Sequence, residues 1–211
     1  MPSSLHIETF CLGDWMTNCF VLHAGGPACW FVDAGFGPGA MTDYVRREHL
    51  VPEAVLLTHA HVDHIAGLQE IRESWPHLPI LIHEAEESFL THPARNLSLV
   101  LAEQVIAPQA TGNLEHGHSI EVDGCAFELR HCPGHSPGGI VLHHAAGNVA
   151  IVGDTLFAGS VGRTDFPASN SELLIQSIRA QLLTLPDSTR LLPGHGPQTT
   201  VGQERAENPF L

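Results

Sequence analysis

The stretch that decides how this sequence is interpreted is residues 58–64, which read Thr-His-Ala-His-Val-Asp-His. It follows a short apolar run over 54–58, which is typical of a buried strand. His59 and His61 lie two residues apart, so on an extended or looped backbone their side chains point to the same side. This spacing differs from the helical H-E-x-x-H pattern, in which two His four residues apart share a face. Asp63 stands where the next helix is expected to begin, so both a metal-ligand role and a helix N-cap role are open for it.

Three further apolar runs, over 127–132, 149–153 and 191–192, lead into a tight turn and then into a side chain that can bind metal. Loops at strand ends can bring residues that are distant in sequence to one point. Gly and Pro in these turns supply the backbone angles that aim the side chains. The side chains that follow the three runs are His135, Asp154 and His195.

These four places together supply five His and two Asp, which is too many ligands for one four-coordinate zinc ion. The number suits two ions that share a bridging carboxylate. A set of His and Asp without Cys suits zinc, iron or manganese, and we expect two divalent ions, with zinc first. A structural zinc site is usually closed and rich in Cys, so an open, catalytic centre is expected. The candidate metal ligands are His59, His61, Asp63, His64, His135, Asp154 and His195.

The order of predicted elements mixes strands and hairpins with interspersed helices, in two similar halves. This order suggests a core of two packed sheets with helices outside. The segment 84–112 is irregular. Strands are expected over 5–11, 18–23, 29–33, 54–58, 79–83, 119–122, 125–132, 139–143, 148–153 and 189–192, and helices over 39–49, 65–75 and 171–185.

The motifs resemble those of the metallo-β-lactamase superfamily. The resemblance extends over essentially the whole chain. It implies an α/β fold in the form of a four-layer αββα sandwich, with two mixed sheets packed face to face and helices outside. The motifs that carry it are V-D-A-G at 32–35, T-H-x-H-x-D-H at 58–64, P-G-H-S-P-G at 133–138, G-D-T at 153–155 and P-G-H-G at 193–196.

Within this superfamily the sequence is most similar to the single-domain glyoxalase II-like (hydroxyacylglutathione hydrolase-like) enzymes. The similarity rests on G-R-T-D-F at 162–166, N-L-S at 96–98 and N-P-F-L at 208–211. Classical glyoxalase II holds glutathione partly through Lys and Tyr side chains of an added helical domain. This sequence has no Lys and one Tyr, Tyr44. We therefore expect the thiol part of a substrate to be held in another way.

The resemblance also implies a role for each ligand. Asp154 is expected to bridge the two ions, and the two carboxylates, Asp63 and Asp154, are candidate catalytic residues. Asp33 is expected to orient the metal loops through hydrogen bonds rather than to bind metal. The first ion is expected on His59, His61 and His135, and the second on Asp63, His64 and His195.

The implied reaction is hydrolysis of a thioester of the hydroxyacylglutathione type. A di-metal centre lowers the pKa of bound water from 15.7 toward about 7 and stabilises the oxyanion of the tetrahedral intermediate. Arg163 is a candidate anchor for an anionic substrate, and a loop-fixing pair with Asp165 is the equal alternative. A second reaction is also open, because persulfide dioxygenases share these motifs. That enzyme uses one iron, here expected on His59, His135 and Asp154.

Composition narrows the remaining possibilities. The chain has 211 residues with 43% hydrophobic and 15% charged side chains, so a single domain over 1–211 is expected. Its formal net charge of −14 leaves no broad basic surface for nucleic acid or an anionic membrane. The expected partner is a small anionic thioester. Residues 1–6 lack signal-peptide features, and the five Cys form no C-x-x-C pair, so a cytoplasmic protein with reduced thiols is expected.

Other residues invite a functional role but are expected to be structural. Cys132 is close to His135, yet a small buried residue behind the loop is the favoured interpretation. Sixteen His are present, and the eleven outside the motifs are expected at the surface or in loops. His116 and His118 are spaced like the pair at 59 and 61, but no partner motif accompanies them.

Overall fold

Two six-stranded sheets organise residues 5–211, which are the residues that the computed structural model describes. The expectation drawn from residues 1–6 therefore lies in part outside the described residues. The chain forms two compact units, the first made of residues up to 114 with 121–125, and the second of residues 115–120 with 126–211. Among the described residues no helix is long and apolar enough to cross a membrane.

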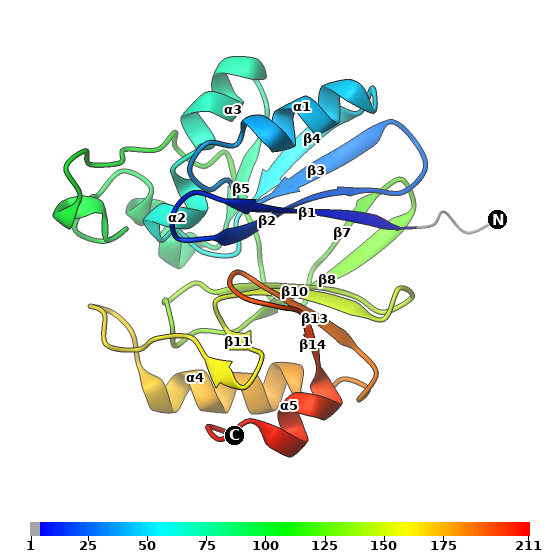
Figure 1. Ribbon diagram of the computed structural model, residues 1–211, viewed down its shortest axis with the longest axis vertical. Coiled ribbons are helices and arrows are strands. Elements are labelled where there is room, and N and C mark those ends of the chain that lie inside the picture. The colour runs from blue at the N-terminus through cyan, green and yellow to red at the C-terminus, as the bar shows by residue number, and fades with distance from the viewer. Residues whose placement is uncertain (1–4) are drawn as a thin grey trace. The chain divides into compact units, whose positions relative to one another are not determined.

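The first unit contains a mixed sheet in the order β1-β2-β3-β4-β5-β6 (Figure 1). The strands β1 to β3 pair antiparallel, and the pairs from β3 to β6 are parallel. Residues 24–27 join β2 to β3, which confirms the predicted hairpin. The strands are β1 (His6–Leu12), β2 (Thr17–His23), β3 (Ala28–Val32), β4 (Val51–Leu56), β5 (Ile80–Ile82) and β6 (Gly112–Asn113).

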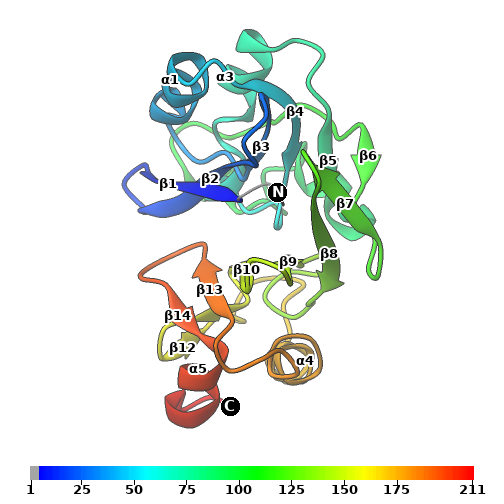
Figure 2. The same cartoon turned by 90° about the vertical axis from the view of Figure 1, so that its right-hand side faces the viewer.

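Helices connect the parallel strands of this sheet, because a parallel crossover needs a long connection. Figure 2 shows β3, β4 and β5 in order across the sheet, with α1 and α3 beside them. Met41 of α1, Leu68 of α3 and Phe31 of β3 belong to one buried cluster. The helices are α1 (Gly39–Arg47), α2 (Val62–Ile65) and α3 (Leu68–Ser74), with short 3-10 helices η1 (Glu84–Phe89) and η2 (Ser98–Val100).

The single helix predicted over 65–75 is two helices in the structure. The chain breaks at Gly67, whose N–H donates to the Ala34 carbonyl over 2.8 Å. A Cβ at Gly67 would clash with the Gly35 carbonyl oxygen, so only Gly fits this approach. The break places α2 as a separate turn against the loop that follows β3. The hydrophobic periodicity continues across the break, which explains why the pattern predicted one helix.

The second unit is built on a sheet in the order β14-β13-β10-β9-β8-β7. β10 and β13 pair parallel, whereas β9 pairs antiparallel with both β8 and β10. A separate hairpin joins β11 (Leu156–Phe157) to β12 (Ser160–Val161). The sheet strands are β7 (Ser119–Val122), β8 (Cys125–His131), β9 (Ile140–His144), β10 (Val149–Gly153), β13 (Arg190–Pro193) and β14 (Thr199–Thr200).

Two helical segments cover one face of this sheet (Figure 1). α4 (Ser171–Ser177) continues into a π-helical stretch, η3 (Ile178–Leu182), and α5 (Val201–Glu207) follows β14. Leu174 and Ile178 pack in one buried cluster with Ala150 of β10. Asn170 caps α4 by accepting a hydrogen bond from the Leu173 N–H over 3.0 Å. The expectation of two mixed sheets with helices is thus confirmed.

Candidate metal centre

The first-unit ligand group, His59, His61, Asp63 and His64, lies on the loop after β4 and on the short helix α2. The carboxyl ends of neighbouring parallel strands meet at one sheet edge, so β3 and β4 both deliver residues to this place. His59 and His64 are 1% and 0% exposed, and their ring centroids lie 4.1 Å apart. The ring of His61 lies 4.7 Å from that of His59. The structure therefore brings these predicted ligands together within this unit.

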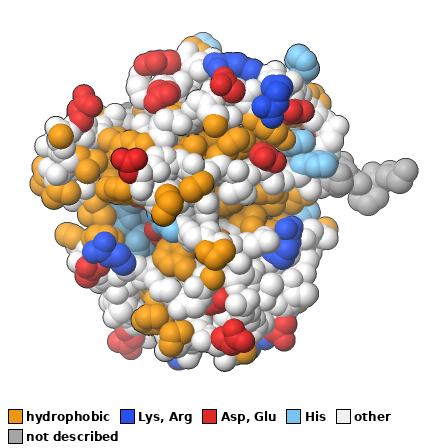
Figure 3. All heavy atoms as spheres, in the orientation of Figure 1, with side chains coloured by type: hydrophobic (Ala, Val, Ile, Leu, Met, Phe, Trp, Pro, Cys, Tyr) orange, Lys and Arg blue, Asp and Glu red, His pale blue; other side chains and the backbone are white. Residues whose placement is uncertain are grey.

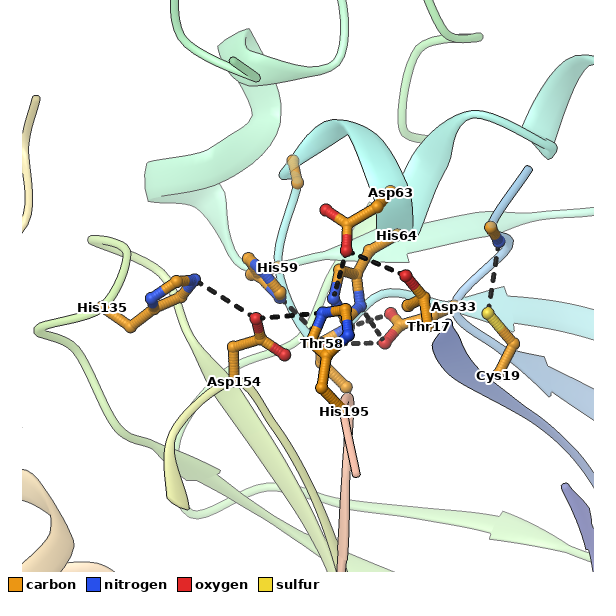
Figure 4. Close-up of polar contacts among 12 residues, drawn as sticks. Thr17, Cys19, Asp33, Thr58, His59, Asp63, His64, His135, Asp154 and His195 are labelled. Carbon is orange, nitrogen blue, oxygen red and sulfur yellow. Dashed lines mark hydrogen bonds and ion pairs between the residues drawn. The ribbon is translucent and has the colours of Figure 1, made fainter. Parts of the chain in front are cut away.

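Asp33 holds this group in place (Figure 4). Its Oδ1 accepts a hydrogen bond from the Thr58 N–H over 2.8 Å, and its Oδ2 accepts from the Thr58 hydroxyl over 2.7 Å. Oδ2 also lies 2.8 Å from Nδ1 of His64. Because a carboxylate only accepts, Nδ1 carries the proton and Nε2 is the nitrogen presented to a metal. The expected hydrogen bonds from Asp33 to the ligand loop are therefore present.

Asp33 adopts a positive φ of 59°, a conformation that Asp and Asn tolerate better than most residues. Its backbone N–H donates to the Leu56 carbonyl over 2.9 Å, so the turn remains tied to β4. The left-handed backbone at this position aims the carboxylate at the ligand loop rather than along β3. This geometry explains why an acidic residue follows the strand directly.

Asp63 is buried and is oriented by a residue from the adjoining strand. The hydroxyl of Thr17, at the start of β2, donates to Asp63 Oδ2 over 2.9 Å. The same oxygen lies 3.5 Å from Nε2 of His64. The residue at the N-cap of α2 is His61, not Asp63, so the N-cap alternative for Asp63 is wrong. The physical reason is that the helix starts at Val62, two residues earlier than an N-cap at Asp63 would require.

Sequence reasoning missed several residues that support this loop. The carboxylate of Glu86, which is fully buried, accepts from the Ala60 N–H over 3.1 Å. The Asn96 carbonyl accepts from the Val62 N–H over 2.8 Å. Glu86 stands in an acidic run that suggests a solvated face, and Thr17 has no motif around it. Of these supporting residues, only Asn96 belongs to a motif, the one at 96–98. That motif indicated the family but not the contact with the ligand loop.

The second-unit ligand group consists of His135, Asp154 and His195. Nδ1 of His135 lies 2.7 Å from the backbone carbonyl oxygen of Arg163, so the ring again presents Nε2. The turn before it requires glycine, because Gly134 has a φ of +136° and a Cβ there would clash with the backbone of Leu174. The turn at Gly134 and the carbonyl of Arg163 together fix the direction of the His135 ring.

Asp154 lies between the other two ligands of its unit (Figure 4). Its Oδ2 is 3.7 Å from Nε2 of His135 and 3.5 Å from Nε2 of His195. The Gly194 N–H donates to the Gly153 carbonyl over 2.9 Å, which holds the ends of the parallel strands β13 and β10 side by side. One carboxylate oxygen thus faces imidazoles from two different loops.

The side chain of Arg163 is mostly exposed and forms the pair with Asp165 that the sequence left as an alternative. Its Nε and Nη2 donate to the Asp165 carboxylate over 3.0 and 2.8 Å. The hydrogen bond to Asp165 raises the pKa of the Arg163 guanidinium, and the same bond lowers the pKa of Asp165. The guanidinium carbon also lies 4.4 Å from the ring centroid of Phe166.

The expectations for Cys132 and for the His residues outside the motifs have different outcomes. Cys132 is 1% exposed, and burial raises its pKa to about 12, so it is a packing residue and not a nucleophile. His116 and His118 are exposed, as expected. His143 and His144 are buried, so the expectation of surface positions is wrong for them. β9 is an inner strand, and its neighbour supplies partners: Nδ1 of His143 lies 3.3 Å from a Glu128 carboxylate oxygen.

The donor set of each unit suits a divalent metal. The first-unit group offers three imidazoles and a carboxylate, and the second-unit group offers two imidazoles and a carboxylate. His64 and His135 each direct Nδ1 to an oxygen acceptor, which is the outer-shell arrangement of metal-binding His. Nitrogen and oxygen donors of this kind suit zinc, iron and manganese.

Comparisons with known proteins place the chain in a family. The model of the Metallo-beta-lactamase superfamily matches residues 12–195. A "Probable metallo-hydrolase YqgX" of Bacillus subtilis is 39% identical over 201 residues, which cover 95% of this chain and 94% of that protein. "Hydroxyacylglutathione hydrolase GloC" of Haemophilus influenzae is 33% identical over 213 residues, with 98% of each chain covered.

Solved structures agree with the family model. The BLEG-1 B3 metallo-beta-lactamase superposes with a TM-score of 0.92 at 36% identity, covering 98% of this chain and 99% of that one. TTHA1623 in a di-iron-bound form superposes with a TM-score of 0.86 at 34% identity, covering 97% of this chain and 100% of that one. The chain has the α/β fold of these proteins and is a metallo-hydrolase that belongs to the metallo-β-lactamase superfamily.

Proposed function

We propose that this protein is a binuclear metal-dependent hydrolase of thioesters of the hydroxyacylglutathione type. In the reaction, water adds to the thioester carbonyl, the carbon–sulfur bond breaks, and a carboxylic acid and a thiol leave. The observation that carries the proposal is Asp154 Oδ2, which faces both His135 and His195. The similarity to a hydroxyacylglutathione hydrolase over nearly the whole chain supports the substrate class.

Each ligand has a place in this proposal. Asp154 would serve as the ligand that the two ions share. Zinc is the first expectation for both ions, although a related structure holds two irons. We assign His59, His61 and His135 to the first ion, and Asp63, His64 and His195 to the second.

When bound, the ions would supply a water of lowered pKa and would polarise the thioester carbonyl. The protein residues supply orientation and proton handling. Asp33 keeps the proton of His64 on Nδ1, and the Arg163 carbonyl does the same for His135. Thr17 fixes Asp63 through Oδ2, and we propose that Asp63 Oδ1 accepts the proton of the attacking water.

Arg163 is the proposed anchor for the anionic part of the substrate. Its guanidinium is exposed and held in one orientation by Asp165 and the Phe166 ring. A substrate carboxylate must therefore compete with Asp165 for the same donors. Because the pair is exposed, we expect only a modest contribution to substrate binding.

The proposed surroundings are the cytoplasm, with a small anionic thioester as the partner and no nucleic acid or membrane. The described cysteines support this, because Cys19, Cys29 and Cys132 are buried thiols that form no disulfide. Such thiols are typical of a reducing compartment. The formal net charge of −14 disfavours a polyanionic partner.

The direct test is the hydrolysis of S-lactoylglutathione by protein purified without chelator and loaded with zinc, iron or manganese. The proposal predicts metal-dependent release of glutathione, lost in His59→Ala and retained in the matched control His118→Ala. Oxygen uptake with glutathione persulfide, without thioester hydrolysis, would favour the dioxygenase alternative on His59, His135 and Asp154.

A further inference from the structure

Exposed apolar side chains of the first unit gather on two segments. Five of the eight large hydrophobic residues that are exposed in the described chain lie on the turn between β1 and β2 or on the segment 98–106. Figure 3 shows hydrophobic side chains gathered on the surface of this unit. The five are Trp15, Met16, Leu99, Val100 and Ile106, which are 45%, 65%, 55%, 88% and 67% exposed.

A cavity of about 500 Å³ opens between these two segments, which is within the usual size range of small-molecule sites. The rings of Trp15 and Phe36 form one wall, with centroids 6.1 Å apart in an edge-to-face arrangement. Gly13, with a φ of +63°, lets Phe36 approach, because a Cβ there would lie 2.9 Å from Phe36 Cβ. We call this cavity the apolar pocket. Its lining is Gly13, Asp14, Trp15, Phe36, Gly37, Leu101 and Glu103.

Residues close in sequence to the walls of the apolar pocket form hydrogen bonds to the first-unit ligand group. The residue after the β1–β2 turn is Thr17, which donates to Asp63. On the other side, Asn96 precedes the segment 98–106 and accepts from the Val62 N–H. Phe36 follows the loop whose Asp33 orients His64. Each wall of the pocket thus lies within five residues, along the chain, of a residue that hydrogen-bonds the ligand group.

The charged residues of the apolar pocket are both acidic, and both are exposed: Asp14 and Glu103. The four Arg of the first unit do not line the pocket and contact other groups, among them Asp43, Glu48, Ser88 and the Pro76 carbonyl. A carboxylate entering the pocket meets like charge, and none of the described residues that line the pocket is a cation. An uncharged apolar group gains contact with Trp15, Phe36 and Leu101.

We propose that the apolar pocket binds the acyl group of the substrate, and that this acyl group is an uncharged alkyl or aryl chain larger than lactoyl. This inference rests on the proposed thioester hydrolysis and names its substrate class. The carboxylates Asp14 and Glu103 act as a filter against acyl groups that end in a carboxylate. The anionic thiol part is held elsewhere.

The first test measures binding and needs no turnover. Isothermal titration of the metal-loaded protein compares S-hexylglutathione with S-methylglutathione, two thioethers that cannot be hydrolysed as thioesters. We expect the hexyl compound to bind at least about tenfold more tightly, because the added methylenes leave water. Trp15→Ala should remove most of this preference, whereas Leu173→Ala, a change at an exposed apolar residue of α4, should retain it. Equal affinities for the two thioethers, or a preference unchanged in Trp15→Ala, would overturn the proposal.

The second test measures selection by charge. We expect kcat/KM for S-hexanoylglutathione to exceed that for S-glutarylglutathione by about tenfold or more. The double variant Asp14→Asn, Glu103→Gln should raise the ratio of the glutaryl value to the hexanoyl value severalfold. If this ratio of kcat/KM values is unchanged in the double variant, the proposed role of the two carboxylates as a filter is wrong.

The failure of the proposed function has a different signature. In that case no thioester is hydrolysed by the metal-loaded protein, while the hexyl preference in the titration and its loss in Trp15→Ala persist.

A different occupant of the pocket would be a second copy of this chain. The protein would then dimerise with rising concentration, Trp15→Ala would abolish the dimer, and the two thioethers would bind with equal affinity. This result would show that the pocket binds a second copy of the chain and would overturn the proposal.

Discussion

Oδ2 of Asp33 lies 2.8 Å from Nδ1 of His64, and both side chains are fully buried. The contact joins the end of β3 to the helix that follows β4. It determines which imidazole nitrogen faces the ligand loop, because the carboxylate can only accept the Nδ1 proton. A ligand supported in this way loses both its orientation and part of its basicity when the supporting carboxylate is removed.

Asp33→Asn therefore should weaken metal binding without unfolding the protein. The amide keeps the size of the side chain but removes the negative charge that holds the His64 proton. We expect a loss of roughly 10–100-fold in affinity for one of the two ions. Competition with a chromophoric chelator measures this affinity. Asp43→Asn, a change at an exposed carboxylate of α1, is the matched control, and an equal loss in both variants would remove the special role of Asp33.

Asp154 and His195 should respond differently to substitution. As the proposed bridge, Asp154 contacts both ions, so Asp154→Ala should reduce the occupancy of both. His195→Ala should chiefly reduce the occupancy of one. Metal analysis of the two purified variants at equal protein concentration distinguishes the outcomes. Small and equal losses in the two variants would contradict a bridging role.

The exposed pair of Arg163 and Asp165 predicts opposite effects on substrate affinity. Arg163→Ala should raise KM for S-lactoylglutathione by up to about fivefold, the scale of an exposed ion pair. Asp165→Asn should lower KM, because it removes the carboxylate that competes with the substrate. Metal content should stay unchanged in both. Arg190→Ala, a change at an exposed cation on β13, is the control; if KM is unaltered in the first two variants, Arg163 is only a loop-fixing residue.

Buried thiols predict a loss of stability at alkaline pH. Burial raises the pKa of Cys29 from 9.0 to about 12, so the folded state holds this proton more tightly than the unfolded chain. Its contribution is complete below pH 9 and is lost as the pH rises from 9 toward 12. Urea unfolding at several pH values in this interval gives the free energy of unfolding as a function of pH. This free energy should fall less steeply with pH in Cys29→Ala than in the unchanged protein, by about 1.4 kcal/mol per pH unit. Identical slopes would mean that Cys29 titrates alike in both states.

Much of the ligand arrangement follows from local sequence, because each predicted ligand stands in the turn or short helix that follows an apolar strand. The strand ends and the turns at Gly134 and Gly194 therefore predict where side chains leave the sheets. What the sequence could not predict depends on tertiary contact. The break at Gly67 arises from close approach to Gly35, which no periodicity records.

The same limit explains the missed and mistaken residues. His143 and His144 look like surface residues, but β9 is an inner strand, and the neighbouring strand β8 supplies a partner for Nδ1 of each ring. Glu86 stands in an acidic run and yet is fully buried against the Ala60 N–H. Burial of a polar residue depends on a partner from a distant segment. Sequence spacing alone does not identify that partner.

The most direct test of the central claim is the number of metal ions per chain in protein purified without chelator and saturated with zinc, iron or manganese. Inductively coupled plasma mass spectrometry, with protein concentration from amino-acid analysis, gives this number. Seven ligands with Asp154 as the bridge predict two ions per chain. A preparation that never exceeds one ion per chain at saturation would contradict the binuclear centre.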